Sequence, residues 1–280
     1  MGGLPIRGLR IAFRGFRIAN VKLGSSCGKV SVLIATRHYT TIDSTNLEAH
    51  RLFAAGERGS VFLLADEQTA GKGRLDRNWA SLRGNCYSTL ILPVTGVNLS
   101  QVPQIGFVVA LAVADVVRKH ADVTPQLKWP NDVLVKGAKI AGILCEVLSQ
   151  QTLTIAIGCG INVAHAPTGL VYPATCLAAQ GATSNRDQVF QSYRDALSYW
   201  LEAWNLGQNF PDIRQAWLQH AAGIGETVSM TTSTHHLTGT FETITEQGAV
   251  MLKPVDGPPH ILHAGDLVIP SLARLRNGFT

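Results

Sequence analysis

Several features that would define other classes of protein are scarce in this 280-residue chain. Charged residues make up only 15% of it, and no uninterrupted apolar run approaches the ~20 residues that a membrane-spanning helix needs. The five cysteines are scattered and form no CxxC pair, which argues against a disulfide framework and a structural zinc site. A hydrophobic content of 46% still suffices for one full-sized core and a smaller unit. We therefore expect a soluble, cytoplasmic protein with no membrane contact.

Acidic residues are missing from the first part of the chain. Residues 1–38 contain seven Lys and Arg and no Asp or Glu, whereas the other 242 residues hold 17 basic and 19 acidic residues. The net charge of +5 thus becomes −2 outside the N-terminal segment, so we expect no nucleic-acid partner. Residues 1–29 are predicted to be a disordered basic tail. A misassigned start, a flexible arm and a transit peptide all remain open as its origin.

A change in the pattern of apolar runs and turn residues predicts two domains in the remaining sequence. Short apolar runs alternate with helical patterns through residues 30–221, which predicts an α+β domain with a mixed sheet and helices on one face. Strands are expected at 32–34, 61–65, 87–92, 133–135, 140–147 and 153–157. A capping box at Thr45-x-x-Glu48 predicts the start of a short helix. Two further helices are expected over 105–117, which is almost wholly apolar, and over 189–204, where apolar and aromatic residues recur at helical spacing. Residues 222–280 read as a small all-β barrel.

One polar segment, residues 66–79, combines glycines with cations. Gly71 and Gly73 let the backbone approach an anion, and Lys72, Arg74 and Arg77 can neutralise a carboxylate and a phosphate brought together. The segment lacks the spacing of a P-loop or a dinucleotide fingerprint. A solvated basic turn is the alternative.

A second segment surrounds Pro130. This proline prevents a helix, so Asn131 and Asp132 are expected on an irregular bend before a strand. The alternative is a structural role without a ligand, in which Trp129 packs in the core and Asn131 and Asp132 form a turn. Lys139 enters an otherwise apolar strand, where its ammonium group must snorkel to water or meet an anion.

Two further segments carry surplus polar groups. Residues 43–46 hold four polar side chains where a helix start uses one or two, so the hydroxyls of Ser44 and Thr45 are available to a neutral polar ring. Residues 158–163 place Asn162 after two glycines at the end of a strand. Asn162 either satisfies the local backbone or binds a nucleotide.

The order and spacing of these four segments resemble biotin protein ligases, also called biotin–[acetyl-CoA-carboxylase] ligases. The likeness runs from about residue 32 to residue 206, and residues 222–280 resemble the SH3-like end domain of that family. It implies a class II synthetase-like catalytic domain that uses ATP and Mg²⁺ to convert biotin to biotinyl-5'-AMP. The biotinyl group is then transferred to a lysine of the biotin carboxyl carrier protein of acetyl-CoA carboxylase.

The resemblance also assigns roles to individual residues. Ser44, Thr45 and Gln68 contact the ureido ring of biotin, Gly71 and Gly73 shape a closing loop, and no cysteine takes part. It assigns catalysis to Lys139, Arg74 and Arg77, and ligand binding to Ser44, Thr45, Asn46, Gln68, Gly71, Lys72, Gly73, Arg74, Trp79, Asn131, Asp132, Lys139, Gly142 and Asn162. Lys72 departs from the family's usual arginine and loses the planar guanidinium fork.

Other functions compete with this interpretation. One alternative is a lipoate or octanoate ligase of the same superfamily, which would need a longer apolar pocket for its acyl chain. The other is a non-enzymatic sensor of biotinyl-adenylate, which would show no turnover. Many bacterial members carry an N-terminal helix-turn-helix. The Gly-rich residues before position 30 lack two capped helices, so we expect no operator binding. Pairing of two chains through sheet edges is left open.

Overall fold

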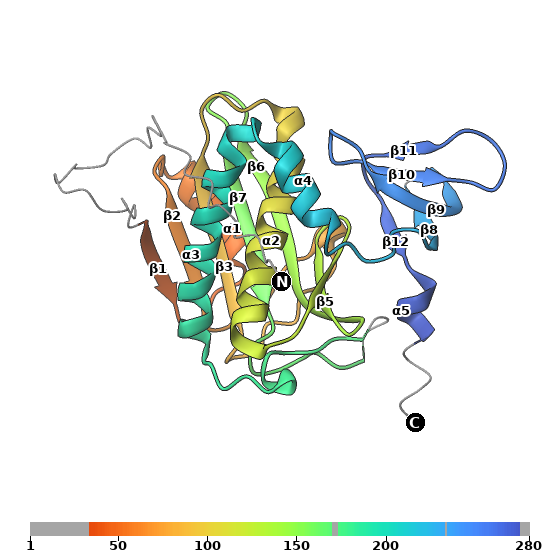
Figure 1. Cartoon of the computed structure of the whole chain (residues 1–280). Helices are drawn as coiled ribbons and strands as arrows, with labels where there is room; N and C mark the ends of the chain where they lie inside the picture. Colours follow the sequence, from red (N-terminus) through yellow and green to blue (C-terminus); the bar gives the residue numbers. More distant parts are fainter. Residues whose placement is uncertain (1–33, 170–172, 233, 275–280) are drawn as a thin grey trace, which may run out of the picture. The chain divides into compact units, whose positions relative to one another are not determined.

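The computed structural model describes residues 34–169, 173–232 and 234–274, so the predicted N-terminal tail lies outside the described residues (Figure 1). A seven-stranded sheet with the order β1-β2-β3-β7-β6-β5-β4 forms the larger part. Its strands are β1 (Ala35–Tyr39), β2 (Val61–Ala65), β3 (Cys86–Pro93), β4 (Pro125–Lys128), β5 (Asp132–Val135), β6 (Ala138–Ser149) and β7 (Thr154–Ile161). β1 and β2 are parallel, and the other neighbours are antiparallel. The predicted mixed sheet is therefore confirmed.

Helices cover both faces of this sheet. α2 (Val102–Ala121) and α3 (Arg186–Trp204) lie side by side on one face, next to α4 (Phe210–Leu218) (Figure 1). α1 (Thr45–Ala54) lies on the other face, where Ala49 packs against Val61 and Leu63 of β2. The prediction of helices on one face is thus wrong for α1. β2 is apolar at every position because both of its faces are buried.

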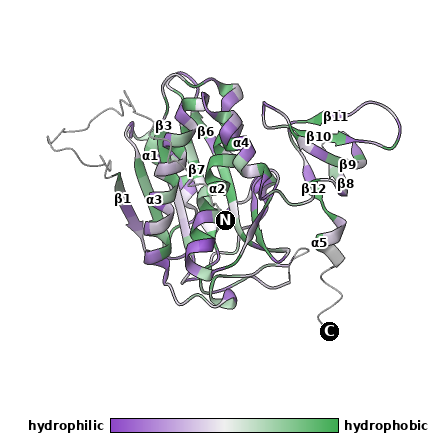
Figure 2. Ribbon diagram, in the orientation of Figure 1, coloured by the Kyte–Doolittle hydropathy of each residue, from purple (hydrophilic) through white to green (hydrophobic). Residues whose placement is uncertain are grey.

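The long apolar helix α2 belongs to the core. Twelve of its 20 residues are buried, and Figure 2 shows hydrophobic colour along most of its length. The stretch Leu99–Ala121 is long and apolar enough to cross a membrane, yet 67% of its apolar 18-residue window is buried inside the protein. A helix enclosed by a sheet and other helices becomes apolar around its whole circumference for the same reason that a membrane helix does.

The predicted capping box of α1 is not formed. Ser44 is the N-cap, its side chain makes no capping hydrogen bond, and the Glu48 carboxylate instead accepts from Arg51 Nε at 2.6 Å. The ion pair with Arg51 draws the carboxylate away from the helix start. The Ser44 hydroxyl is therefore left unused by the helix that it begins.

The C-terminal part is a five-stranded antiparallel sheet with the order β11-β10-β9-β8-β12. Its strands are β8 (Thr227–Thr231), β9 (His236–Ile244), β10 (Val250–Lys253), β11 (His260–Leu262) and β12 (Asp266–Val268), followed by the short helix α5 (Pro270–Arg274). Trp129 Nε1 donates to Gly248 O at 3.1 Å, which ties the turn between β9 and β10 to the end of β4. Gly248 has φ +85°, and an added Cβ would lie 3.1 Å from Phe107, so only glycine suits this contact.

Candidate functional site

A cavity of about 580 Å³ gathers most of the predicted site residues. Its walls come from the start of α1, the segment 68–79, the ends of β4 to β7, and the C-terminal segment 266–272. Thirteen of the predicted residues line it: Ser44, Thr45, Asn46, Gln68, Lys72, Gly73, Arg74, Arg77, Trp79, Asn131, Asp132, Lys139 and Gly142. Gly71 and Asn162 are the predicted residues that do not.

One end of the cavity is neutral, polar and buried. Ser44 and Thr45 are 2% and 4% exposed. Gln68 Oε1 accepts from Thr45 N at 2.8 Å and from Thr45 Oγ1 at 3.1 Å, and Gln68 Nε2 donates to Ser81 Oγ at 2.9 Å. Ser44 lines the cavity, and its hydroxyl makes no hydrogen bond within the described part of the chain. This end therefore offers fixed hydrogen-bonding groups to an uncharged polar ligand.

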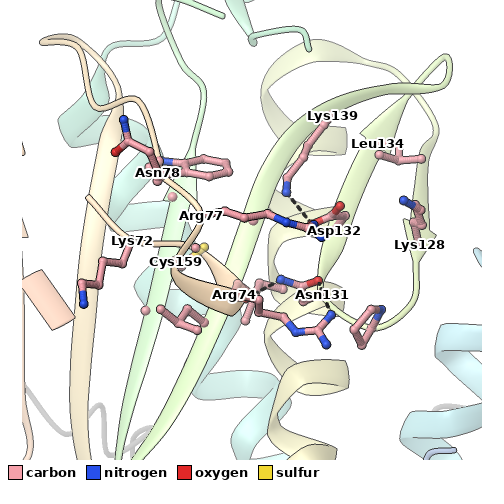
Figure 3. Close-up of a pocket in the computed structure, with 18 of the residues that line it drawn as sticks. Lys72, Arg74, Arg77, Asn78, Lys128, Asn131, Asp132, Leu134, Lys139 and Cys159 are labelled. Atoms are coloured by element: carbon pink, nitrogen blue, oxygen red, sulfur yellow. Dashed lines mark hydrogen bonds and ion pairs between the residues drawn. The ribbon is translucent and has the colours of Figure 1, made fainter. Parts of the chain in front are cut away.

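The other end is lined by cations that are already paired. Lys139 Nζ lies 2.6 Å from Asp132 Oδ1, and the two side chains are only 26% and 19% exposed. Arg74 Nη1 donates to Gly265 O at 3.4 Å and lies 3.5 Å from Asn131 Oδ1. Figure 3 shows Arg74 and Arg77 of the segment 68–79 and Lys139 of β6 lining the same space. Such a cluster can neutralise two anions held close together.

Burial changes the acid–base properties of this cationic end. It lowers the pKa of Arg74, while Asp266 and Asp132 oppose the shift. It also lowers the pKa of Lys128, a lining residue that the sequence analysis did not single out. Lys128 pairs in register with Asp132 across β4 and β5, so strand alternation was the signal that could have found it.

The C-terminal sheet contributes to the same cavity. Asp266 of β12 forms an ion pair with Arg77, and Gly265 O accepts from Arg74. Leu267, Ile269 and Leu272 add apolar lining. These contacts join positions 189 and 191 residues apart, which no local pattern predicts.

Lys72 lies at the edge of the cavity and differs from the other cations. Its Nζ lies 3.4 Å from the exposed carboxylate of Asp76, and Figure 3 shows its side chain pointing away from Arg74 and Arg77. An exposed pair of this kind contributes little to stability. The effect of a lysine in place of the family's arginine stays a prediction.

Trp79 forms a wall between the two ends. A Cβ added at Gly142 would lie 2.8 Å from its Cζ3 atom, and one added at Gly160 would lie 2.6 Å from its Nε1 atom. The indole can lie against β6 and β7 only because both positions are glycine. Lys139 Nζ lies 5.1 Å from the ring centroid, and the buried Trp79 Nε1 has no partner among the described residues.

Gly71 and Asn162 have structural roles outside the lining. An added Cβ at Gly71 would lie 2.6 Å from Ser81 Oγ and from Trp79 O, so this glycine permits close packing. Asn162 is 1% exposed, and its Nδ2 donates to Thr175 O at 3.0 Å. Asn162 thus satisfies local backbone, which was one of its two interpretations. The nucleotide contact of Asn162 and the role of Gly71 in a loop that closes over the ligand stay predictions.

Three cysteines of the sheet are poorly suited to act as nucleophiles. Cys159 lies at the cavity wall, but burial raises the pKa of its thiol well above the ordinary range. Burial likewise raises the pKa of Cys86 and Cys145 to about 12. Since the thiolate is the reactive form, these groups are inert near neutral pH.

The fold and the cavity define a protein with one site that has a neutral polar end and a cationic end. The model of the Biotin/lipoate A/B protein ligase family matches residues 38–162. A biotin–[acetyl-CoA-carboxylase] ligase of Paracoccus denitrificans is 38% identical over 82% of this chain and 95% of its own. One from Mycobacterium tuberculosis is 31% identical over 91% of this chain and 94% of its own.

A solved structure agrees with these relatives. The biotin protein ligase from Aquifex aeolicus, in complex with biotin and ATP, superposes with a TM-score of 0.71. It is 25% identical, and the match covers 83% of this chain and 97% of that one. The chain therefore belongs to the biotin protein ligases of the Biotin/lipoate A/B protein ligase family.

Proposed function

We propose that this protein is an enzyme that uses ATP to activate biotin as biotinyl-5'-AMP and then biotinylates a lysine of a biotin carboxyl carrier protein. The observation that carries the proposal is a single cavity with a neutral polar end and a cationic end. The names of the relatives and the biotin and ATP bound to the Aquifex aeolicus ligase support it. The neutral end suits the ureido ring, and the cationic end suits the carboxylate and the nucleotide.

In the first half-reaction a biotin carboxylate oxygen attacks the α-phosphorus of ATP, and pyrophosphate leaves. Two anions must approach one another, so Lys139, Arg74 and Arg77 neutralise charge as the new P–O bond forms. Ser44, Thr45 and Gln68 hold the ureido ring and thereby aim the carboxylate. Positioning and charge neutralisation supply most of the catalysis.

In the second half-reaction the lysine amine of the carrier attacks the carbonyl carbon of the mixed anhydride. AMP leaves, and the amine loses a proton as the amide forms. The adenylate must be shielded from water between the steps, and we assign this task to the segment 71–74. Arg74 ties that segment to the C-terminal sheet through Gly265 O.

Mg²⁺ is proposed to enter as part of the nucleotide. The two carboxylates in the lining, Asp132 and Asp266, are already paired with Lys139 and Arg77. Within the described ranges, no group of three or more His, Cys, Asp or Glu side chains is arranged to hold a metal ion. Mg²⁺ bound mainly by phosphate oxygens and water fits this lining better than an all-protein site.

The finer assignments are also proposals. We assign residues 30–221 to the catalytic domain and residues 222–280 to an SH3-like domain, whose five antiparallel strands support that architecture. The carrier of acetyl-CoA carboxylase is the proposed acceptor, because relatives carry that name. We also propose a cytoplasmic location.

The purified chain tests this proposal when incubated with biotin, Mg·ATP and a carrier domain. We expect pyrophosphate release that needs both biotin and ATP, and a mass increase on one carrier lysine. Release supported by lipoate instead of biotin would favour the lipoate ligase. Binding without turnover would favour the non-enzymatic sensor.

A further inference from the structure

Behind the neutral end of the cavity lies a buried chain of hydrogen bonds that reaches the surface. Thr89 of β3 is fully buried, and its Oγ1 lies 2.8 Å from Thr45 Oγ1 and 2.7 Å from Asn46 Oδ1. Asn46 Nδ2 then donates to Glu146 Oε2 of β6 at 2.6 Å and to Leu144 O at 3.3 Å. The chain runs from the cavity to a carboxylate whose side chain is 36% exposed.

The chemistry of these groups fixes the orientation of the Asn46 amide. Glu146 Oε2 and Leu144 O can only accept hydrogen bonds, so the amide nitrogen must face them. The amide oxygen then faces Thr89 and requires its hydroxyl proton. Gly158 makes room for this arrangement, because a Cβ there would lie 2.2 Å from Asn46 Oδ1.

This orientation has a consequence for the cavity. Because Thr89 gives its one proton to Asn46, its Oγ1 can only accept from Thr45 Oγ1 at 2.8 Å, and Gln68 Oε1 is a second acceptor for the Thr45 hydroxyl at 3.1 Å. The proton of Thr45 is thereby used within the protein, and the lone pairs of its oxygen are offered to the ligand. Thr45 thus presents an acceptor, which matches a ring N–H, whereas the unengaged Ser44 hydroxyl is able to donate to a ring C=O.

We propose that Thr89 and Glu146 are positioning residues that set the hydrogen-bond polarity of the ureido end without touching the ligand. This proposal rests on the proposed function and adds residues that no site motif contains. Thr89 of β3 pairs in register with Leu63, and Glu146 of β6 pairs with Ala156. The side chains of both residues hydrogen-bond to Asn46 of α1. Selectivity for a ring with adjacent N–H and C=O groups would thus originate one layer behind the cavity wall.

The test compares Thr89→Val with Thr89→Ser in biotin-dependent pyrophosphate release. Valine keeps the shape and removes the hydroxyl, so the KM for biotin should rise about tenfold, the size of one lost hydrogen bond. The KM for ATP should stay within about twofold, and Thr89→Ser should restore the KM for biotin. A general loss of packing would change both KM values, and serine would not rescue it. An unchanged KM for biotin in Thr89→Val would overturn the proposal.

A second variant covers the case in which Thr89→Val does not fold. Glu146→Ala removes a partly exposed side chain and should raise the KM for biotin about threefold, with Glu202→Ala on the exposed face of α3 as the matched control. Equal KM values in these two variants would overturn the proposal. If the wild-type chain releases no pyrophosphate with biotin and ATP, the proposed function fails as well. Wild-type turnover with insensitive variants removes the positioning role alone.

Discussion

The two ends of the cavity are built in different ways. At the neutral end, Ser44, Thr45 and Asn46 are at most 5% exposed and are held by the packed sheet behind them. At the cationic end, Arg77 is 60% exposed and its partner Asp266 comes from the C-terminal sheet. The neutral end is therefore formed before a ligand arrives, whereas the cationic end holds ion pairs that anionic ligands must exchange for their own contacts. Salt should weaken binding at the second end far more than at the first.

Lys139→Ala should produce the largest effect, because it removes a charge that both the biotin carboxylate and the α-phosphate use. We expect adenylate formation to fall by roughly 10²- to 10³-fold while the thermal unfolding midpoint is retained. Pyrophosphate release measures the first quantity and calorimetry the second. Lys119→Ala, at an exposed position of α2, is the control for loss of a lysine. Wild-type turnover of Lys139→Ala would place the chemistry elsewhere.

Arg74→Ala should expose the adenylate to water. The side chain joins the glycine-containing segment to Gly265 O, so its loss should free that segment. We expect the ratio of free AMP from hydrolysed adenylate to biotinylated carrier to increase about tenfold, even if adenylate formation slows; this corresponds to roughly 1.4 kcal/mol. Chromatography of AMP against biotinylated carrier gives the ratio. An unchanged ratio would show that the segment does not shield the intermediate.

Ser44→Ala should separate binding from stability at the neutral end. The KM for biotin should rise about five- to tenfold through one lost hydrogen bond. An ordinary N-cap serine costs about 1 kcal/mol when replaced by alanine, but the Ser44 hydroxyl makes no capping bond, so stability should hardly change. Denaturant unfolding measures that cost. A full capping penalty with an unchanged KM would assign Ser44 to the helix instead of the ligand.

Asp266→Asn should have the smallest effect, since its pair with Arg77 is exposed to solvent. We expect the KM for ATP to change about two- to threefold, and the change should disappear at high salt. Titrating NaCl in the pyrophosphate assay measures this. Glu226→Gln, also near the C-terminal sheet but outside the cavity lining, is the control. An effect that persists in high salt would mean that Asp266 acts by more than charge.

Local patterns predicted many elements of the fold, because apolar runs and turn residues act within a few positions. The strands at 61–65 and 87–92, the core helix and the hairpin around Lys136-Gly137 were all confirmed. β4 and β11 were not predicted, because they are short and begin with Pro125 and His260, which are not typical of strands. These two strands form because the adjacent strands pair with them. The face of the sheet that α1 covers is set by tertiary packing, which periodicity does not encode.

The residues of the site also fall into those that local sequence patterns predicted and those that only the tertiary structure brings together. Motif residues with unusual local chemistry, such as Lys139 in an apolar strand, were found from the sequence and line the cavity. Thr89 and Glu146 were missed because they look like ordinary strand residues until β3, β6 and α1 bring them together. Asp266 was missed for a similar reason, since its partner Arg77 belongs to a distant segment.

A crystal structure of the protein with biotin and a non-hydrolysable ATP analogue tests the central claim most directly. We predict the ureido ring against Ser44, Thr45 and Gln68, with the biotin carboxylate and the α-phosphate both within about 3 Å of cationic groups that include Lys139 Nζ. A biotin molecule bound outside this cavity, or one whose carboxylate faces away from Lys139 and the nucleotide, would contradict the account.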